Sequence, residues 1–163
     1  MKIRPGVCVL LLAAIACAAC ASDQPAPSAE NDLEFHRPPA NEFEAAFAKQ
    51  PGVQPVRWGG WMKTEVEGSG AMPTPDSVVK VNYRGTLTDG TEFDDSSKHG
   101  GPATFSLRGV VPCWTNGVPM MKVGGKAEFV CPAVSAYGDA GSPPRVPGGA
   151  TLVFEIELLD IVK

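Results

Sequence analysis

Cysteine and histidine are the residue types in this chain best suited to metal or covalent chemistry. The 163-residue sequence contains five cysteines and two histidines. Cys113 and Cys131 stand 18 positions apart, which is not a zinc-ligand spacing, and only His36 and His99 supply imidazoles. The sequence has no evident Ser/His/Asp or Cys/His nucleophilic set and no glycine-rich loop for phosphate. We therefore expect no metal site, and no residue pattern points to covalent catalysis.

The first twenty residues have the pattern of a secretory signal peptide. Lys2 and Arg4 form a short positive segment, residues 7–16 are an almost unbroken apolar run, and small residues follow. The apolar run is too short for a permanent membrane-spanning helix. We therefore predict an export signal over residues 1–19, which includes Cys8.

A cysteine preceded by small residues resembles the lipobox of bacterial lipoproteins. Cys17 and Cys20 both fit, although neither has the leucine that usually stands three positions earlier. We predict lipidation of Cys17 or Cys20; the alternative is ordinary cleavage after residues 14–16, which leaves a soluble periplasmic protein. Alanine follows each cysteine, and by analogy with Gram-negative lipoprotein sorting this favours the outer membrane over the inner. The chain would face the periplasm and contact the membrane only through its N-terminal lipid.

Export also bears on the two downstream cysteines, because disulfides persist in oxidising compartments. Cys113 and Cys131 can pair within the chain in only one way. Closing the 18-residue loop between them would contribute roughly 3 kcal/mol. The alternative is two separate buried thiols that pack as small hydrophobic side chains.

Composition excludes several other classes of protein. The net charge is −4, and without Lys2 and Arg4 the 14 basic residues fall to 12 against 18 acidic ones. That balance argues against a nucleic-acid partner, which requires a basic surface. No apolar run of 18 residues follows the N-terminal segment, which argues against a polytopic membrane protein. The 18 glycines and 16 prolines favour a turn-rich β or α+β chain.

Residues 20–57 have the composition of a flexible tether with one short helix. Within it, residues 21–41 have four prolines and few large apolar side chains. Residues 41–50 favour a helix with Asn41 as its N-cap, and a Pro-Gly pair ends it. Phe43 and Phe47 stand four apart, so we expect this helix to pack on the edge of the next domain; a dimerisation helix is the alternative.

Residues 58–163 form the predicted folded domain. Residues 152, 154, 156 and 158 are apolar and would share one face of a strand, while residues 153, 155 and 157 would face the other way. Such strands around one short helix predict an antiparallel sheet packed on that helix. The expected pieces are strands at 79–83, 127–131 and 151–159, a short extended piece from 105, turns at 88–91 and 122–126, and a helix at 115–121.

Seven motifs in this domain resemble the FKBP-type peptidyl-prolyl cis-trans isomerases, in unbroken order. They are VNYRGTLTDG (81–90), FDDS (93–96), VVPCW (110–114), GVPMM (117–121), VGGK (123–126), AYG (136–138) and VPGGATLVFEIE (146–157). The resemblance implies a five-stranded antiparallel half-barrel around one short helix, with an apolar pocket between them. It also implies isomerisation of X–Pro bonds in exported, folding proteins, with no cofactor and with proline-containing polypeptides as partners.

The resemblance assigns roles to matching residues. Trp114 would be the pocket floor, and Asp94 would be the polar group at the edge. The aromatic walls would be Tyr83, Phe93, Phe105 and Phe154, and the aliphatic walls would be Val110, Val111 and Val146. The Val111 N–H and the Tyr137 hydroxyl would donate hydrogen bonds to substrate carbonyls. Tyr83 or Arg84 would orient Asp94.

Several positions depart from the family pattern. Cys113 stands where glycine usually precedes the tryptophan, and Cys131 replaces an aliphatic residue, a pair of changes that a disulfide would explain. Ala103 lowers one wall, and Ser142 and Arg145 change a loop. These departures bear on affinity for macrolide inhibitors more than on isomerase activity.

Three other functions compete with the isomerase hypothesis. The first is a chaperone or proline-peptide-binding module with little turnover. A lipocalin-like carrier is disfavoured by the helix that interrupts the strands. The last is structural anchoring alone. Turnover of a proline peptide separates the enzyme from all three.

Overall fold

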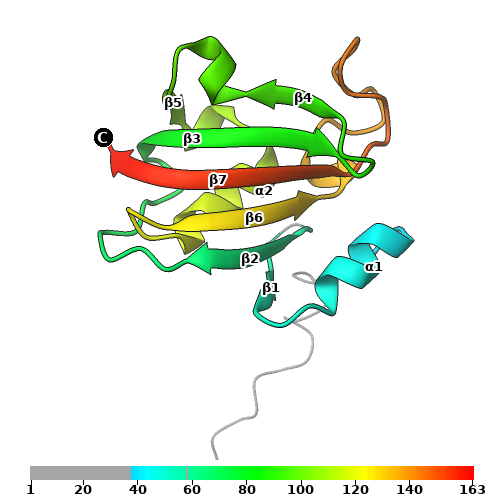
Figure 1. Cartoon of the computed structure of the whole chain (residues 1–163), viewed down its shortest axis with the longest axis horizontal. Helices are drawn as coiled ribbons and strands as arrows, with labels where there is room; N and C mark the ends of the chain where they lie inside the picture. Colours follow the sequence, from blue (N-terminus) through cyan, green and yellow to red (C-terminus); the bar gives the residue numbers. More distant parts are fainter. Residues whose placement is uncertain (1–37, 58) are drawn as a thin grey trace, which may run out of the picture.

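An antiparallel sheet is the central element of the fold in a computed structural model, which describes residues 38–57 and 59–163 (Figure 1). The predicted signal, the candidate lipidation sites Cys17 and Cys20, and the first part of the predicted tether lie outside these residues. The strands are β1 (Val53–Pro55), β2 (Trp61–Val66), β3 (Val78–Leu87), β4 (Glu92–Asp95), β5 (Ala103–Ser106), β6 (Lys126–Cys131) and β7 (Leu152–Ile161).

The sheet order is β1-β2-β6-β7-β3-β4, and β5 also pairs with β3. This confirms the predicted α+β class, although the described residues form seven strands where five were predicted. Two features account for the difference. The short β1 adds to the edge at β2 and lies before the predicted domain boundary at residue 58. β4 and β5 lie one after the other along the same edge of β3, because η1 (Ser96–His99) interrupts them.

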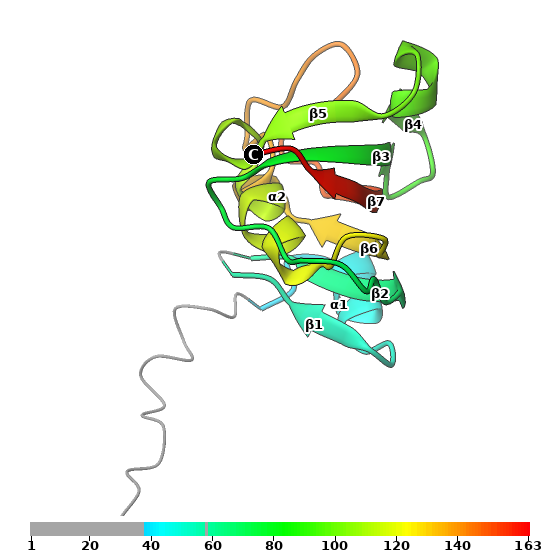
Figure 2. The same ribbon diagram turned by 90° about the vertical axis from the view of Figure 1, so that its left-hand side faces the viewer.

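The two faces of the sheet bury different side chains, as the strand alternation predicts. Leu152, Phe154, Ile156 and Leu158 of β7 belong to the main core under α2 (Pro112–Gly117). Val153 points the other way and packs in a second cluster with α1 (Glu42–Ala48). Figure 2 shows α2 and α1 on opposite faces of the sheet.

The short helix α2 begins three residues earlier than the predicted 115–121 and ends at Gly117. Pro112 stands in its first turn, where its missing N–H costs nothing. The chain continues as the 3-10 turn η3 (Val118–Met120), because Pro119 has no N–H to continue an α-helix. At Gly117 a side chain would meet the Phe129 ring at 2.4 Å, so glycine lets α2 lie close to β6.

A disulfide joins α2 to β6. The Sγ atoms of Cys113 and Cys131 are 1.96 Å apart, which is the pairing expected from the sequence, and both residues are fully buried. Two further 3-10 turns complete the domain: η2 (Leu107–Gly109) leads into α2, and η4 (Ala133–Ser135) follows β6.

The predicted helix near 41–50 is α1, with Asn41 as its N-cap. The Asn41 side-chain oxygen accepts from the Glu44 N–H at 2.9 Å. Phe47 is buried against Trp61 and Val153, whereas Phe43 is 37% exposed. The inward position one turn earlier belongs to Glu44, whose burial was not expected from the sequence. No helix among residues 38–57 and 59–163 is long and apolar enough to cross a membrane.

Candidate active site

A cavity of about 280 Å³ opens between the inner face of the sheet and α2. It is lined by Tyr83, Phe93, Asp94, Phe105, Gly109, Val110, Val111, Trp114, Tyr137 and Phe154. Strands β3, β4, β5 and β7 supply the aromatic walls together with Asp94, and α2 supplies Trp114. Nine of the ten predicted site residues therefore meet in one cavity. Gly109 is an addition that only the fold reveals.

Aromatic rings meeting edge to face form the floor and walls. The Trp114 ring lies 5.5 Å from Tyr83, 5.7 Å from Phe105 and 5.3 Å from Phe154, measured between ring centroids. Phe93 meets Phe154 at 5.6 Å with the ring planes at 87°. Such edge-to-face pairs are favourable, and each ring holds its neighbour in place. The floor and walls of the cavity are thus an apolar surface of packed aromatic rings.

Trp114 carries a polar atom that the apolar floor does not satisfy. Its Nε1–H is buried and has no hydrogen-bond partner among the described residues. A buried donor without an acceptor costs about 1–3 kcal/mol. The aromatic contacts, rather than a hydrogen bond, therefore hold this indole.

Asp94 is the acidic group on the cavity wall, and three donors hold it. The Tyr83 hydroxyl donates to Oδ2 at 2.8 Å, the Asp95 N–H lies 3.1 Å from Oδ1, and His99 Nε2 lies 2.8 Å from Oδ1. Burial opposes ionisation of Asp94, but the hydrogen bonds from Tyr83 and His99 outweigh it and lower the pKa of the carboxyl. The pKa of Tyr83 is raised, first by burial and then by its hydrogen bond to Asp94.

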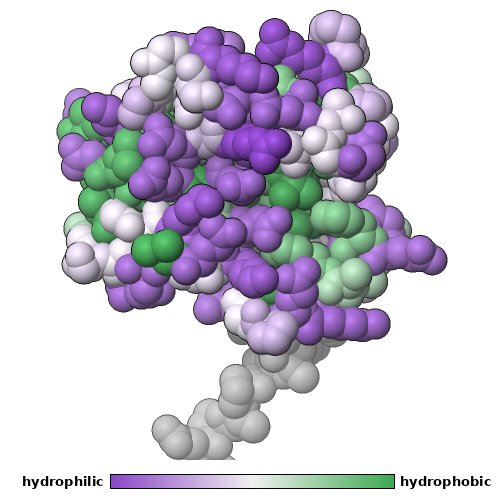
Figure 3. All heavy atoms as spheres, viewed as in Figure 1, coloured by the Kyte–Doolittle hydropathy of each residue, from purple (hydrophilic) through white to green (hydrophobic). Residues whose placement is uncertain are grey.

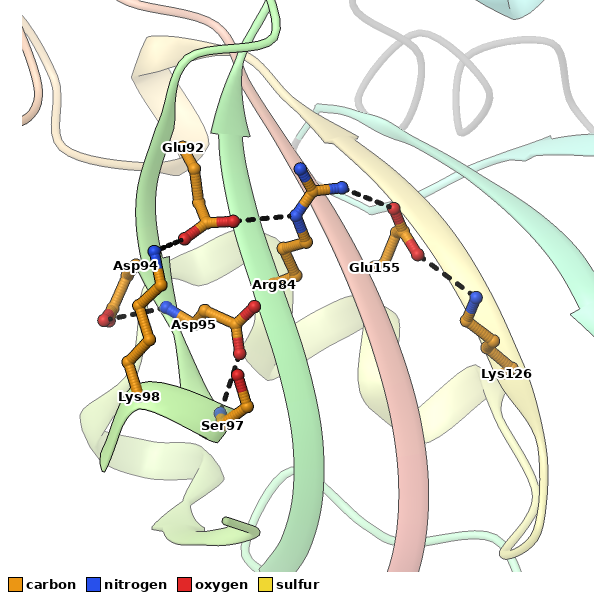
Figure 4. A network of polar contacts seen from close by, with 8 residues as sticks. All are labelled: Arg84, Glu92, Asp94, Asp95, Ser97, Lys98, Lys126 and Glu155. Atoms are coloured by element: carbon orange, nitrogen blue, oxygen red, sulfur yellow. Dashed lines mark hydrogen bonds and ion pairs between the residues drawn. The ribbon is translucent and has the colours of Figure 1, made fainter. Parts of the chain in front are cut away.

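Arg84, the other residue predicted to orient Asp94, faces the outside of the sheet instead. Its guanidinium binds Glu92 at 2.9 Å and Glu155 at 3.5 Å, and Glu155 also binds Lys126 (Figure 4). Adjacent strand positions point to opposite faces, so Tyr83 enters the cavity while Arg84 cannot. Figure 3 shows mainly hydrophilic side chains over this outer face.

Two hydrogen-bond donors at the cavity remain unengaged. The Val111 N–H at the start of α2 and the Tyr137 hydroxyl donate to no other described residue. The Tyr137 side chain is 40% exposed, and burial together with the charge of Asp94 raises its pKa. Both donors are therefore available to an acceptor in the cavity.

Val146 is the predicted wall residue that the fold places elsewhere. It is 3% exposed and lines an adjoining cavity of about 260 Å³, together with Phe93, Asp94, Tyr137, Ser142, Pro143, Pro144 and Arg145. Sequence reasoning also missed His99 as a partner of Asp94. The two are five positions apart, and only the turn η1 brings their side chains together.

A sequence profile of FKBP-type peptidyl-prolyl cis-trans isomerases matches residues 70–159, more than half of the chain. The chain belongs to this family. Within the family, the chain is similar to the FKBP-type isomerase FkpA of Aeromonas hydrophila, with 45% identity over 135 residues that cover 83% of this chain and 50% of the relative. FkpA of Escherichia coli K12 is 42% identical over 132 residues, covering 81% of this chain and 48% of the relative.

Solved structures of the FKBP-type family agree with this fold. The crystal structure of FkpA from Escherichia coli matches with a TM-score of 0.70 and 45% identity, covering 74% of this chain and 56% of that one. The peptidyl-prolyl cis-trans isomerase from Pseudomonas syringae pv. tomato matches with a TM-score of 0.70 and 35% identity, covering 74% and 89%. This chain spans about half the length of the curated FkpA relatives.

Proposed function

We propose that this chain is a peptidyl-prolyl cis-trans isomerase that acts on X–Pro bonds without covalent chemistry. The observation that carries the proposal is the aromatic cavity over Trp114, with unengaged donors at Val111 and Tyr137. Membership of the FKBP-type family supports it.

The cavity suits the physical problem of rotating an imide bond. Resonance keeps the bond planar, with a barrier of about 18–20 kcal/mol. An apolar surface stabilises the planar, charge-separated imide less than water does, so it favours the twisted state. The rings of Phe93, Trp114 and Phe154 would enclose the proline. Catalysis then depends on shape and on preorganised hydrogen bonds that are stronger in the twisted state.

The two unengaged donors would hold the substrate backbone while the bond turns. In this proposal the Val111 N–H and the Tyr137 hydroxyl bind substrate carbonyls. Asp94 stays ionised at the cavity edge and is kept in place by Tyr83. The partners would be proline-containing segments of exported proteins that are still folding, since such bonds can delay folding by tens of seconds.

Turnover of a proline peptide by the full chain tests the proposal. We expect Trp114→Leu to lower kcat/KM at least tenfold, because the floor of the cavity is lost. Trp61→Leu is the matched control, since Trp61 is also buried, at 7% exposed against 4% for Trp114, but lies in the cluster on the opposite face of the sheet. Tyr137→Phe is a milder second variant that removes only a hydroxyl.

Peptide binding should be measured beside turnover. Binding of the peptide without acceleration of its isomerisation would overturn the enzyme proposal in favour of a peptide-binding module. Equal losses in Trp114→Leu and Trp61→Leu would mean that only stability changed. Adding a macrolide inhibitor of the family tests whether the altered loop at Ser142 and Arg145 weakens such binding.

We also propose that the chain is exported and anchored by a lipid on Cys17 or Cys20, facing the periplasm from the outer membrane. The supports are the positive and apolar N-terminal segment and the small residues before each cysteine. Fatty-acid labelling of Cys17→Ser, Cys20→Ser and the control Cys8→Ser in a Gram-negative host identifies the site. A fully labelled chain in both single variants and in the double variant contradicts lipidation at either position.

A further inference from the structure

The two adjoining cavities share a wall, so one bound peptide can occupy both. Phe93, Asp94 and Tyr137 line the aromatic cavity of about 280 Å³ and also the neighbouring cavity of about 260 Å³. Consecutive Cα atoms are about 3.8 Å apart. Because the cavities meet at three shared residues, a residue next to a proline in the first cavity can face the second.

The far side of the second cavity is a tight hairpin. Ser142 and Val146 exchange both backbone hydrogen bonds, at 2.9 and 3.0 Å, and Pro143, Pro144 and Arg145 form the tip between them. Gly141 has a φ of +66°, and a side chain there would meet the Val146 carbonyl at 2.4 Å. The backbone that carries Arg145 is thus held by hydrogen bonds and close packing.

Arg145 brings a positive charge to this cavity, and the fold leaves that charge available. Its guanidinium makes one hydrogen bond, to the Phe93 carbonyl at 3.4 Å. Across residues 38–57 and 59–163, no carboxylate lies within ion-pair distance of it. By contrast, Asp94 on the shared wall is already occupied by Tyr83, His99 and the Asp95 N–H.

We propose that Arg145 makes the second cavity a subsite for an acidic side chain adjacent to the isomerised proline. The inference rests on the proposed isomerase function and adds a substrate preference to it. The guanidinium can bind a carboxylate with two parallel hydrogen bonds, while the polar lining at Ser142 tolerates a hydrated group. The oxygens of Asp94 on the shared wall already accept hydrogen bonds from other groups, so the open partner for an acid in this cavity is Arg145.

The expected preference is modest, because Arg145 is exposed and its charge is screened by salt. We expect peptides with glutamate beside the proline to have a kcat/KM about 3- to 5-fold above those with glutamine. The advantage should shrink as ionic strength rises.

The experiment compares peptides that differ only beside the proline, carrying glutamate, glutamine or lysine, in one set before the proline and in another after it. Two-dimensional exchange NMR gives the catalysed rate above the uncatalysed one for the full chain. Arg145→Gln should abolish the glutamate advantage, Arg145→Lys should keep part of it, and Arg145→Glu should favour lysine instead. Arg108→Gln is the matched control, because that exposed arginine pairs with Asp76 outside both cavities.

Each outcome decides the proposal. A glutamate advantage in either peptide set that follows the charge at position 145 supports it. Turnover of all peptides with no dependence on charge, or the same loss of preference in Arg108→Gln, overturns it while the isomerase function stands. If no peptide is turned over, the proposed isomerase function fails. The affinities of the same peptides for the wild type and Arg145→Glu then decide the subsite alone.

Discussion

At the scale of single residues, the Tyr83 hydroxyl connects the apolar cavity to its acidic edge. The ring packs against Trp114 and Phe105, and the hydroxyl holds Asp94 at 2.8 Å. One side chain therefore serves both the wall and the polar group. The two contributions can be separated, because phenylalanine keeps the ring and removes only the oxygen.

Tyr83→Phe should lower kcat/KM for a proline peptide by about 3- to 10-fold, because Asp94 loses the donor that positions it. The free energy of unfolding should change by only about 1 kcal/mol, since one hydrogen bond is lost and the ring contacts remain. The pKa of Asp94, followed by carboxyl NMR, should rise. An unchanged kcat/KM would show that the position of Asp94 does not matter for turnover.

At the scale of secondary-structure elements, a disulfide and a set of hydrogen bonds hold the two helices on the sheet. The Cys113–Cys131 disulfide fastens α2, which carries Trp114, to β6. On the opposite face, Glu44 of α1 is fully buried and accepts hydrogen bonds from the Thr151 hydroxyl at 2.6 Å and from the Ala40 N–H at 2.6 Å. The disulfide supports the candidate site, whereas the hydrogen bonds of Glu44 lie away from it.

Replacing Cys113 and Cys131 together by alanine should lower the free energy of unfolding by roughly 3 kcal/mol, because the unfolded chain regains the freedom of an 18-residue loop. Denaturant unfolding measures the change. Reducing the wild type should cause a similar loss, and the reductant should have no effect on the double variant. A stable reduced wild type would mean that core packing alone holds α2.

Glu44→Ala should release α1 while leaving the candidate site intact. The change leaves the buried Thr151 hydroxyl without its acceptor, at a cost of about 1–3 kcal/mol, so amide exchange in residues 42–48 should accelerate strongly. Glu42→Ala is the control, because Glu42 is exposed on the same helix. Turnover of a proline peptide should be unaffected in both variants. A parallel loss of turnover in Glu44→Ala would indicate that α1 is coupled to the cavity through the sheet.

At the scale of the whole molecule, carboxylates with lowered pKa values are spread over the β3–β4 side of the domain. Hydrogen bonds from the Thr91 backbone, from Lys98 and from the Ser97 side chain lower the pKa values of Asp89, Glu92 and Asp95 respectively. Glu128 on β6 behaves in the opposite way, because burial and the nearby Glu65 raise its pKa. The ionised carboxylates with lowered pKa values therefore stabilise the folded state, whereas ionised Glu128 destabilises it.

Acid should destabilise the protein. A carboxyl whose pKa is lower in the folded state contributes stability above its unfolded pKa of about 4 and loses it as pH falls through the folded value. We expect the free energy of unfolding to decline below about pH 4, and to decline less in Asp95→Asn. Glu128→Gln should be more stable than the wild type near neutral pH, because a carboxyl with a raised pKa is destabilising when ionised. Denaturant midpoints of the wild type and both variants, measured across the pH range, test both predictions.

Much of the fold could be predicted because it depends on local patterns. The alternation along β7, the Asn41 cap and the turn at residues 88–91 each act within a few residues. The resemblance to the family predicted ten site residues, and the fold places nine of them in one cavity. The helix α2 lies at residues 112–117 and not at the predicted 115–121, because Pro112 can stand in a first helical turn and Pro119 ends the α-helix, and both effects are local.

The sequence by itself determined the family, the two faces of the strands and the types of side chain at the cavity. For the two downstream cysteines it allowed one pairing and left separate thiols as the alternative. Only the tertiary structure decided which partners those side chains meet. Glu44 reaches Thr151 across 107 positions, Arg145 reaches the Phe93 carbonyl across 52, and His99 binds Asp94 through the turn η1. Such contacts depend on strand register and loop path, which are set by the packing of the whole core, so no local pattern specifies them.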